Sequence, residues 1–217
     1  MIALVLPGVY APQDDTALLT EALHAEAPRP GARVLDVGTG SGALALAAAR
    51  RGAEVTAVDV SWTAVWTARL NAWLTRQPVR IRRGNLFHPV RGRTYDLILA
   101  NPPYVPEPGT VRAPRGRARA WDAGPDGRLL LDRICRDAPG LLKAGGVLLI
   151  VHSSLSGTER TVHALRAAGL RASVVRRRRI AFGPVLRSRA GRLRRSGLLP
   201  AADETEELVV IRAERPC

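Results

Sequence analysis

Short apolar runs of strand character alternate with helix-type segments along nearly the whole of this 217-residue chain. The first expected strand leads through a glycine-rich loop into an alanine-rich helix that ends near residue 51. Units of this kind place their strands side by side in a parallel sheet, with helices on both faces. We therefore expect an α/β fold built on a mostly parallel, doubly wound sheet of seven strands. The expected strands are 33–37, 54–59, 79–83, 95–100, 146–152, 172–177 and 207–212.

Helical spacing and capping residues predict the helices between these strands. They are expected at 14–27, 43–51, 61–75, 127–142 and 158–168. No helical pattern stands out between the last two strands, so we expect them to form an antiparallel hairpin with an arginine-rich loop. We interpret the chain as one domain over residues 1–217, with a helical lead-in at 1–30 and the closing hairpin at 171–217.

Composition bounds the class of protein. With 46% hydrophobic and 24% charged residues, the chain has the balance of an ordinary globular protein. No apolar run approaches 18 residues, and the first ten residues lack a basic start and contain Pro7 and Gly8. We therefore expect no membrane segment or signal peptide, and a cytoplasmic location. Two cysteines are too few for a zinc site. The four histidines are scattered along the sequence, so we expect no metal site.

The formal net charge of +14 is unevenly distributed. Residues 171–195 contain ten arginines and no acid, and residues 110–119 add four arginines, whereas residues 1–60 have seven acids against four arginines. These stretches either contact an anionic macromolecule such as RNA or reflect a general use of arginine, since Lys143 is the single lysine. Charge alone leaves both interpretations open.

Chemistry-bearing residues follow several of the expected strands. The glycine loop comes after 33–37, Asp59 ends 54–59, Asn85 follows 79–83, and an Asn-Pro-Pro-Tyr segment follows 95–100. Because parallel strands end at one edge of a sheet, where ligands of such folds bind, we expect these residues to form one cleft.

The glycine loop indicates a particular kind of ligand. Asp36 precedes Gly38 and Gly40, and the third glycine is Gly42, one position earlier than in the dinucleotide-binding pattern. An acid beside the loop disfavours a pyrophosphate but suits an ammonium group, and Asp59 is placed to accept hydrogen bonds from two ribose hydroxyls. A nucleoside joined to an amino acid is S-adenosylmethionine (SAM), which we expect as the cofactor.

The segment Asn101-Pro102-Pro103-Tyr104 is the most specific motif. Two prolines fix the backbone and remove N–H donors, so the loop presents carbonyl oxygens rigidly. The Asn101 side chain adds another acceptor and Tyr104 a flat wall. Such a cradle suits a planar –NH2 group, whose two hydrogens it would hold while the nitrogen lone pair is aimed at a methyl donor. Asn101, Pro102 and Tyr104 are the expected catalytic residues, acting by orientation and electrostatics.

With these motifs established, the chain resembles class I SAM-dependent methyltransferases, and specifically the HemK-like family of protein-glutamine N5-methyltransferases. The similar segments are VYAPQDDTALL (9–19), VLDVGTGSGALAL (34–46), NPPYVP (101–106), WDAGPDGRLLLDRI (121–134) and LLKAGGVLLIVHSS (141–154). The resemblance implies a Rossmann-like fold. It implies SAM contacts for Thr16, Asp36, Gly38, Gly40, Asp59, Asn85, Leu86 and Asn101, and acceptor contacts for Asn101 through Tyr104.

Two features depart from the family pattern. Asn85 stands where the family usually has an aspartate for the adenine amino group. Only 32 residues precede the first strand, so the N-terminal helical domain of the long members is not expected here. The short members act with a small zinc-binding activator protein, so such a partner is a further expectation. The acceptor is expected to be a glutamine of a translation release factor; an exocyclic amine of RNA or DNA and a small biosynthetic molecule remain alternatives.

The tryptophans carry two more predictions. Trp62, Trp66 and Trp73 have the spacing of one helix face, which we interpret as a core face. Trp121, in a glycine-containing segment near the cleft, is a candidate for the substrate mouth. Cys135 is expected to be a small buried residue of a helix.

Overall fold

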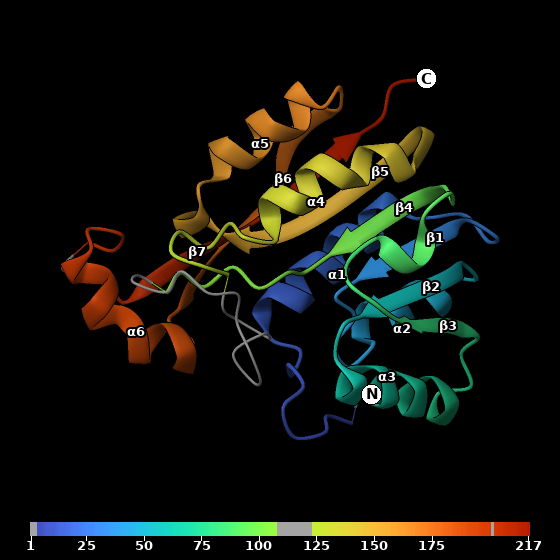
Figure 1. The fold of residues 1–217 in the computed structure, drawn as a ribbon, viewed down its shortest axis with the longest axis horizontal. Coiled ribbons are helices and arrows are strands. Elements are labelled where there is room, and N and C mark those ends of the chain that lie inside the picture. The colour runs from blue at the N-terminus through green and yellow to red at the C-terminus, as the bar shows by residue number, and fades with distance from the viewer. Residues whose placement is uncertain (1–3, 108–122, 201) are drawn as a thin grey trace.

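The computed structural model describes residues 4–107, 123–200 and 202–217. Seven strands form one sheet in the order β3-β2-β1-β4-β5-β7-β6 (Figure 1). The pairings from β3 to β5 are parallel, and β7 is antiparallel to both of its neighbours. The expected α/β architecture and the antiparallel closing strands are therefore confirmed. The strands are β1 (Arg33–Val37), β2 (Glu54–Asp59), β3 (Val79–Arg83), β4 (Tyr95–Ala100), β5 (Leu142–Ser153), β6 (Arg171–Ala181) and β7 (Thr205–Glu214).

Helices cover both faces of the sheet. In β4, Leu97 and Leu99 pack into the apolar layer under α1 and α2, whereas Ile98 and Ala100 pack into the layer under α4 and α5. This alternation follows from the two-residue period of a strand and makes the central strands apolar on both sides. The helices are α1 (Asp14–Glu26), α2 (Ala43–Ala49), α3 (Trp62–Leu74), α4 (Leu131–Asp137), α5 (Thr158–Ala167) and α6 (Pro184–Arg195), with short 3-10 turns η1 (His88–Val90), η3 (Ala138–Leu141) and η4 (Ser154–Ser156).

The connection between β6 and β7 corrects the sequence prediction, because it contains the helix α6. Pro184 occupies its first turn, where the missing N–H costs nothing. Leu186, Ala190 and Leu193 make one apolar face and pack with Phe182 in a small separate core. The five arginines of α6 obscured this narrow apolar stripe in the sequence.

The expected helix at 127–142 is also shorter than predicted. Helix α4 begins at Leu131, a 3-10 turn follows it, and β5 begins at Leu142. The helix cannot include Gly127, which has a left-handed φ of 76°, and it ends at Asp137, before the 3-10 turn that contains Pro139. Cys135 lies buried on α4, and burial raises the pKa of its thiol to about 11.

The prediction that Trp62, Trp66 and Trp73 belong to the core is wrong. They are 54%, 58% and 75% exposed. The buried side of α3 is made instead by small residues such as Ala64, Ala68 and Ala72. Apolar spacing located one face of the helix correctly but could not say which face meets the sheet.

Within the described part of the chain, no helix combines the length and apolar character needed to span a bilayer.

Candidate functional site

The glycine loop between β1 and α2 folds against the end of β2. Gly38, Gly40 and Gly42 all have positive φ, which a residue with a Cβ adopts at a cost of roughly 1–2 kcal/mol. The amide of Gly38 donates to the Val58 carbonyl at 2.8 Å, and that of Gly40 donates to Asp59 Oδ2 at 3.0 Å. The loop therefore lies beside Asp59, as the sequence predicted.

Asp36 is fully buried at the end of β1. Its Oδ2 accepts hydrogen bonds from Thr39 Oγ1 at 2.6 Å and from the Ala45 amide at 3.1 Å, so it braces the loop and the start of α2. Its Oδ1 has no partner within the described structure. Burial raises the pKa of Asp36 to about 6, although these two hydrogen bonds oppose the rise. An unpaired buried carboxylate oxygen is available to a donor such as an ammonium group.

Asp59 is oriented by two backbone amides, Gly40 N–H to Oδ2 and Ser61 N–H at 2.8 Å to Oδ1. Each oxygen keeps acceptor capacity for a ligand hydroxyl. Asn85 is exposed, and its Oδ1 accepts from Arg133 Nη2 at 3.1 Å. Leu86 has a φ of 47°, a strained conformation for leucine of the kind that gathers at binding sites.

The reaction loop meets the glycine loop directly. A Cβ added to Gly38 would lie 4.0 Å from the Asn101 carbonyl oxygen. Asn101 Nδ2 donates to Thr16 Oγ1 at 3.3 Å, and the Thr16 hydroxyl is 3.2 Å from Asp15 Oδ1. This chain of bonds engages the amide nitrogen of Asn101 and leaves its Oδ1, which has no partner among the described residues, able to accept a hydrogen bond.

Tyr104 is held by a carboxylate that sequence reasoning missed. Its hydroxyl donates to Asp15 Oδ2 at 3.1 Å, and the Tyr10 hydroxyl donates to the same oxygen at 2.7 Å. Burial raises the pKa of Tyr104 well above its usual range, and the nearby Asp15 charge adds to the rise. Burial and the same Asp15 charge also raise the pKa of Tyr10, so both phenols stay protonated and serve as donors. Asp15 stands next to Thr16 in the segment 9–19, which was the available signal.

Glu206, near the start of β7, is a second acid that the sequence did not single out. It is 8% exposed, and its Oε2 has no partner among the described residues. Burial raises its pKa, a hydrogen bond from Ser153 opposes the rise, and Asp15 adds to it. Two acids from opposite ends of the chain thus border the Tyr104 wall. Only the antiparallel return of β7 brings them together.

The segment after the undescribed residues 108–122 closes over the reaction loop. A Cβ on Gly127 would collide with the Tyr104 carbonyl oxygen and with Ser156 Oγ. Arg128 is 2% exposed and binds the Ser156 carbonyl at 2.5 Å, Thr161 Oγ1 at 3.0 Å and Asp132 Oδ1 at 2.6 Å. This buried arginine fixes the segment to α4 and α5. Because arginine is usually found on the surface, the sequence did not suggest this role. The predicted substrate residue Trp121 lies outside the described residues.

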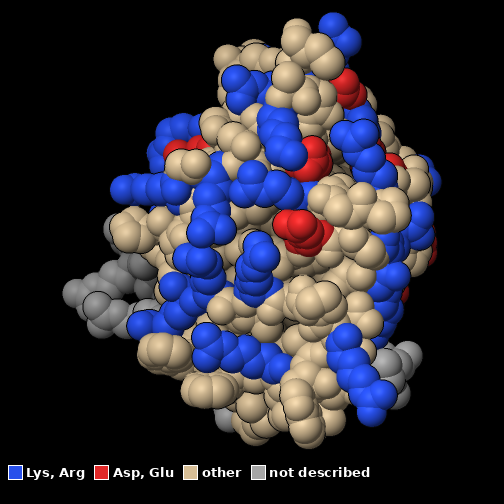
Figure 2. Space-filling view, turned by 90° about the vertical axis from the view of Figure 1, so that its right-hand side faces the viewer, with Lys and Arg blue, Asp and Glu red and all other residues tan. Residues whose placement is uncertain are grey.

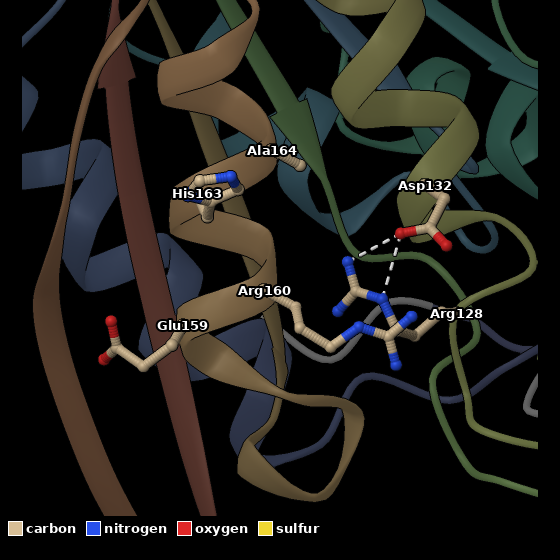
Figure 3. Close-up of a pocket in the computed structure, with 6 residues that line it drawn as sticks. All are labelled: Arg128, Asp132, Glu159, Arg160, His163 and Ala164. Carbon is tan, nitrogen blue, oxygen red and sulfur yellow. Dashed lines mark hydrogen bonds and ion pairs between the residues drawn. The ribbon is translucent and has the colours of Figure 1, made fainter.

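Arg128 also borders an open pocket of about 450 Å³ between α4 and α5 (Figure 3). The remaining lining residues are Asp132, Glu159, Arg160, His163 and Ala164. In the close-up, Asp132 is bonded to the Arg128 guanidinium and the Arg160 side chain lies alongside it. None of the predicted site residues lines this pocket.

Helix α6 is tied to the residues that follow the reaction loop. Glu107 forms ion pairs with Arg189 at 2.8 Å and Arg192 at 2.9 Å, and Val105 packs against the apolar face of α6. The exposed arginines of α6 therefore lie beside the reaction loop.

A second basic surface covers the opposite end of the sheet, where the parallel strands begin. Figure 2 shows this end with many basic and few acidic side chains. Residues that the topology places there include Arg50, Arg51, Arg91, Arg171 and Arg215. Within residues 1–60, acids and arginines are thus partly separated in space. Asp36 and Asp59 lie at the candidate site, whereas the arginines lie at the end of the sheet where the parallel strands begin.

Among the described residues, no three His, Cys, Asp or Glu side chains gather as metal ligands would.

Comparison with solved structures defines the class of fold. The chain superimposes on a chain of the E. cuniculi Mtq2–Trm112 complex, responsible for methylation of the termination factor eRF1. The TM-score is 0.68 at 21% identity, covering 96% of this chain and 99% of that one. It also matches the T. thermophilus 16S rRNA methyltransferase RsmC, solved with AdoMet and guanosine, with a TM-score of 0.65 at 21% identity, covering 97% of this chain and 46% of that one. The fold is that of a class I, Rossmann-like methyltransferase.

Sequence comparison identifies the family. Residues 2–113 match the methyltransferase small domain. The chain is 35% identical to a putative protein N5-glutamine methyltransferase of Methanocaldococcus jannaschii, over 86% of this chain and 93% of that relative. It is 41% identical to the release factor glutamine methyltransferase of Bordetella pertussis, over 76% of this chain but 64% of the relative's length. The chain belongs to the protein N5-glutamine methyltransferases of the methyltransferase small domain family, and it is a SAM-dependent N-methyltransferase.

Proposed function

We propose that this methyltransferase modifies the side-chain amide of a glutamine in a protein, of the translation release factor kind. The observation that carries the proposal is the orientation of Asn101. Its amide nitrogen is engaged by Thr16, so its carbonyl oxygen is the atom left to receive an N–H of the acceptor. A second –CONH2 group is complementary to that oxygen and to the proline-flanked backbone carbonyls.

The described residues fit SAM. The unpaired Oδ1 of Asp36 suits a donor on the amino-acid part, and the two backbone-oriented oxygens of Asp59 suit ribose hydroxyls. Leu86, with its strained backbone, and Asn85 would border the base. Because Arg133 already binds Asn85 Oδ1, that side chain is a weaker adenine acceptor than a free carboxylate. When bound, SAM supplies a methyl group attached to a positively charged sulfur.

The residues of the chain act on the acceptor nitrogen by holding it. An amide nitrogen is a poor nucleophile because its lone pair is delocalised into the carbonyl. Acceptors that bind both of its hydrogens out of the amide plane favour a pyramidal nitrogen with a localised lone pair. The new C–N bond would form as the methyl–sulfur bond breaks, with the sulfur keeping that electron pair as a neutral thioether. The acceptor nitrogen, positively charged at that point, would then release a proton to solvent. The contribution of the loop is therefore orientation and electrostatic stabilisation.

The surroundings of the site support a macromolecular acceptor. Glu107 pairs with Arg189 and Arg192, which holds α6 beside the residues that follow the reaction loop. The exposed arginines of this helix are Arg187, Arg192 and Arg195. We propose that they guide an acidic surface of the substrate or of its ribosomal environment. We further propose that residues 1–217 act as one domain in the cytoplasm. We also propose that a small zinc-binding activator protein accompanies the chain, as the resemblance to the short family members implies; the similar Mtq2 structure is itself a complex with a second protein, Trm112.

The test is methyl transfer from labelled SAM to purified release factors, with hydrolysis of the product to identify the labelled residue. We expect label on glutamine. Asn101→Ala should retain SAM affinity and lower kcat by about 10²–10³-fold, the effect of losing one preorganised polar contact. Label removed by nuclease would establish the base-amine alternative, and label in a small molecule the biosynthetic one. Unchanged turnover in Asn101→Ala would refute the cradle mechanism.

A further inference from the structure

Most of the exposed large hydrophobic side chains of the described structure lie on or just before α3, which packs beside the edge strand β3 (Figure 1). Eight large hydrophobic side chains are exposed in the described residues, and six of them fall within residues 60–74. We call these six the tryptophan face. Its members are Val60, Trp62, Trp66, Leu70, Trp73 and Leu74.

The three tryptophans form a stripe rather than a scatter. At 3.6 residues per turn, Trp62, Trp66 and Trp73 fall within about 40° around the helix axis. Each exposes more than half of its side chain, and a tryptophan buries roughly 150–250 Å² when it is covered. The stripe therefore offers a few hundred Å² of contiguous apolar area, the size at which an exposed patch marks an interaction site.

The tryptophan rings are oriented by arginines. The Arg83 guanidinium lies 4.6 Å from the centre of the Trp62 ring, and that of Arg69 lies 5.2 Å from the Trp66 ring. Arg69 also donates to the Ile81 carbonyl of β3 at 3.5 Å. These contacts place the stripe against the open edge of the sheet and limit the rotamers of two of its rings, which lowers the entropy lost on binding.

The charge around the face selects the partner. Residues 60–93 contain seven arginines and no acid. Among the described residues, no arginine of this stretch is joined to a carboxylate by a salt bridge. A second copy of the chain would bring like charges together and is disfavoured. Aliphatic members such as Leu70 and Leu74 favour a protein over a nucleic acid, whose bases would need free aromatic faces.

We propose that the tryptophan face is the docking surface for a protein whose contacting region is apolar at the centre and acidic at the rim. Trp62, Trp66 and Trp73 supply the buried anchors, a role in which tryptophan is enriched, and the arginines of β3 supply the surrounding charge. The surface is separate from the reaction loop. The inner side of α3 supports the glycine loop, since Asn71 Nδ2 donates to the Ser41 carbonyl at 2.9 Å. SAM affinity must therefore accompany each measurement.

The experiment begins with the full chain carrying a photo-crosslinking amino acid at position 73, exposed to lysate of the source organism. The crosslinked protein is identified, purified and titrated calorimetrically against the wild-type chain and three variants. We expect Trp66→Ala to weaken binding at least tenfold and Arg83→Glu to weaken it and reduce its salt dependence. Leu129→Ala, which changes an exposed apolar residue outside the face, should stay within twofold of wild type.

Each other result overturns the proposal. A ribonuclease-sensitive crosslink would assign the face to RNA, and a crosslinked dimer would assign it to a second copy. No crosslinked protein, or a purified partner that binds Trp66→Ala and wild type equally, would show that the face is not a docking surface. Because SAM affinity and methyl transfer are measured separately, failure here is distinguishable from failure of the glutamine assignment.

Discussion

Replacing Thr16 with valine would remove the hydroxyl that orients Asn101 while keeping the shape of the side chain. In the structure this hydroxyl accepts from Asn101 Nδ2 at 3.3 Å and lies 3.2 Å from Asp15 Oδ1. Without it, the Asn101 amide can rotate by half a turn and present its –NH2 group to the acceptor, a donor facing a donor. Only the fraction of molecules with the oxygen correctly placed would then transfer methyl groups.

The size of the effect follows from the bond that is lost. A neutral hydrogen bond of this kind contributes about 0.5–1.5 kcal/mol, which corresponds to a decrease in kcat of about 2- to 13-fold. This is well below the loss of about 10²–10³-fold expected for Asn101→Ala, because the catalytic oxygen is still present in part of the population.

The assay is the initial rate of methyl transfer at saturating SAM and saturating acceptor, with SAM affinity measured by calorimetry. The matched control is Thr20→Val, one helical turn further along α1, where the hydroxyl donates to the Thr16 carbonyl at 2.7 Å. We expect that control to keep the wild-type kcat. A Thr16→Val enzyme as fast as wild type would refute the orienting role. One as slow as Asn101→Ala would show that Thr16 does more than orient.

Two further predictions test the packing around the site. Gly127→Ala places a Cβ against the Tyr104 carbonyl oxygen at a φ of 76°. We expect it to lower the free energy of unfolding, measured in urea, by about 2–4 kcal/mol and to lower kcat. The control is Gly92→Ala, which has a φ of 75° but no atom within 4 Å of the added Cβ, and it should lower the free energy of unfolding by only about 1–2 kcal/mol. Equal losses would contradict the steric explanation. Burial lowers the pKa of His152 from 6.5 to about 4 in the folded protein. As the pH falls, this histidine therefore takes up a proton in the unfolded protein before it does so in the folded one. The free energy of unfolding should consequently decrease by about 3 kcal/mol between about pH 7 and pH 4. His152→Gln should lack this part of the decrease in urea unfolding at the two pH values, and an identical decrease in both proteins would contradict it.

Much of the fold and several residues of the candidate site could be predicted because the sequence patterns that indicate them are local. The glycine loop carries its own turn conformations, and two successive prolines make the reaction loop rigid wherever it occurs. Asp36, Asp59 and Asn101 lie at or just after the carboxyl ends of strands that are neighbours in the sheet. Knowing that these strands are parallel was therefore enough to bring the three residues together. Thr16 was reached by resemblance, and the structure places it against Asn101.

The remaining site residues could not be predicted because their partners are distant in the sequence. Glu206 meets the Asp15 cluster only because β7 inserts antiparallel between β5 and β6. Arg128 reads as a surface residue, yet it is buried because carbonyl groups from η4 and the start of α5 converge on its guanidinium. No sequence pattern near Glu206 or Arg128 predicts that these distant groups come together.

The sequence by itself determined the alternating α/β architecture, the cofactor loop and the amide cradle, since each depends on backbone preferences within a few residues. The tertiary structure decided which side of each amphipathic segment is inside. The stripe of Trp62, Trp66 and Trp73 was visible in the sequence, but small alanines on the opposite side of α3 pack closer to the sheet and α2, and so the tryptophans lie outside. Close packing against a sheet stabilises the helix orientation whose buried face fits the sheet without gaps, even when the opposite face is more apolar.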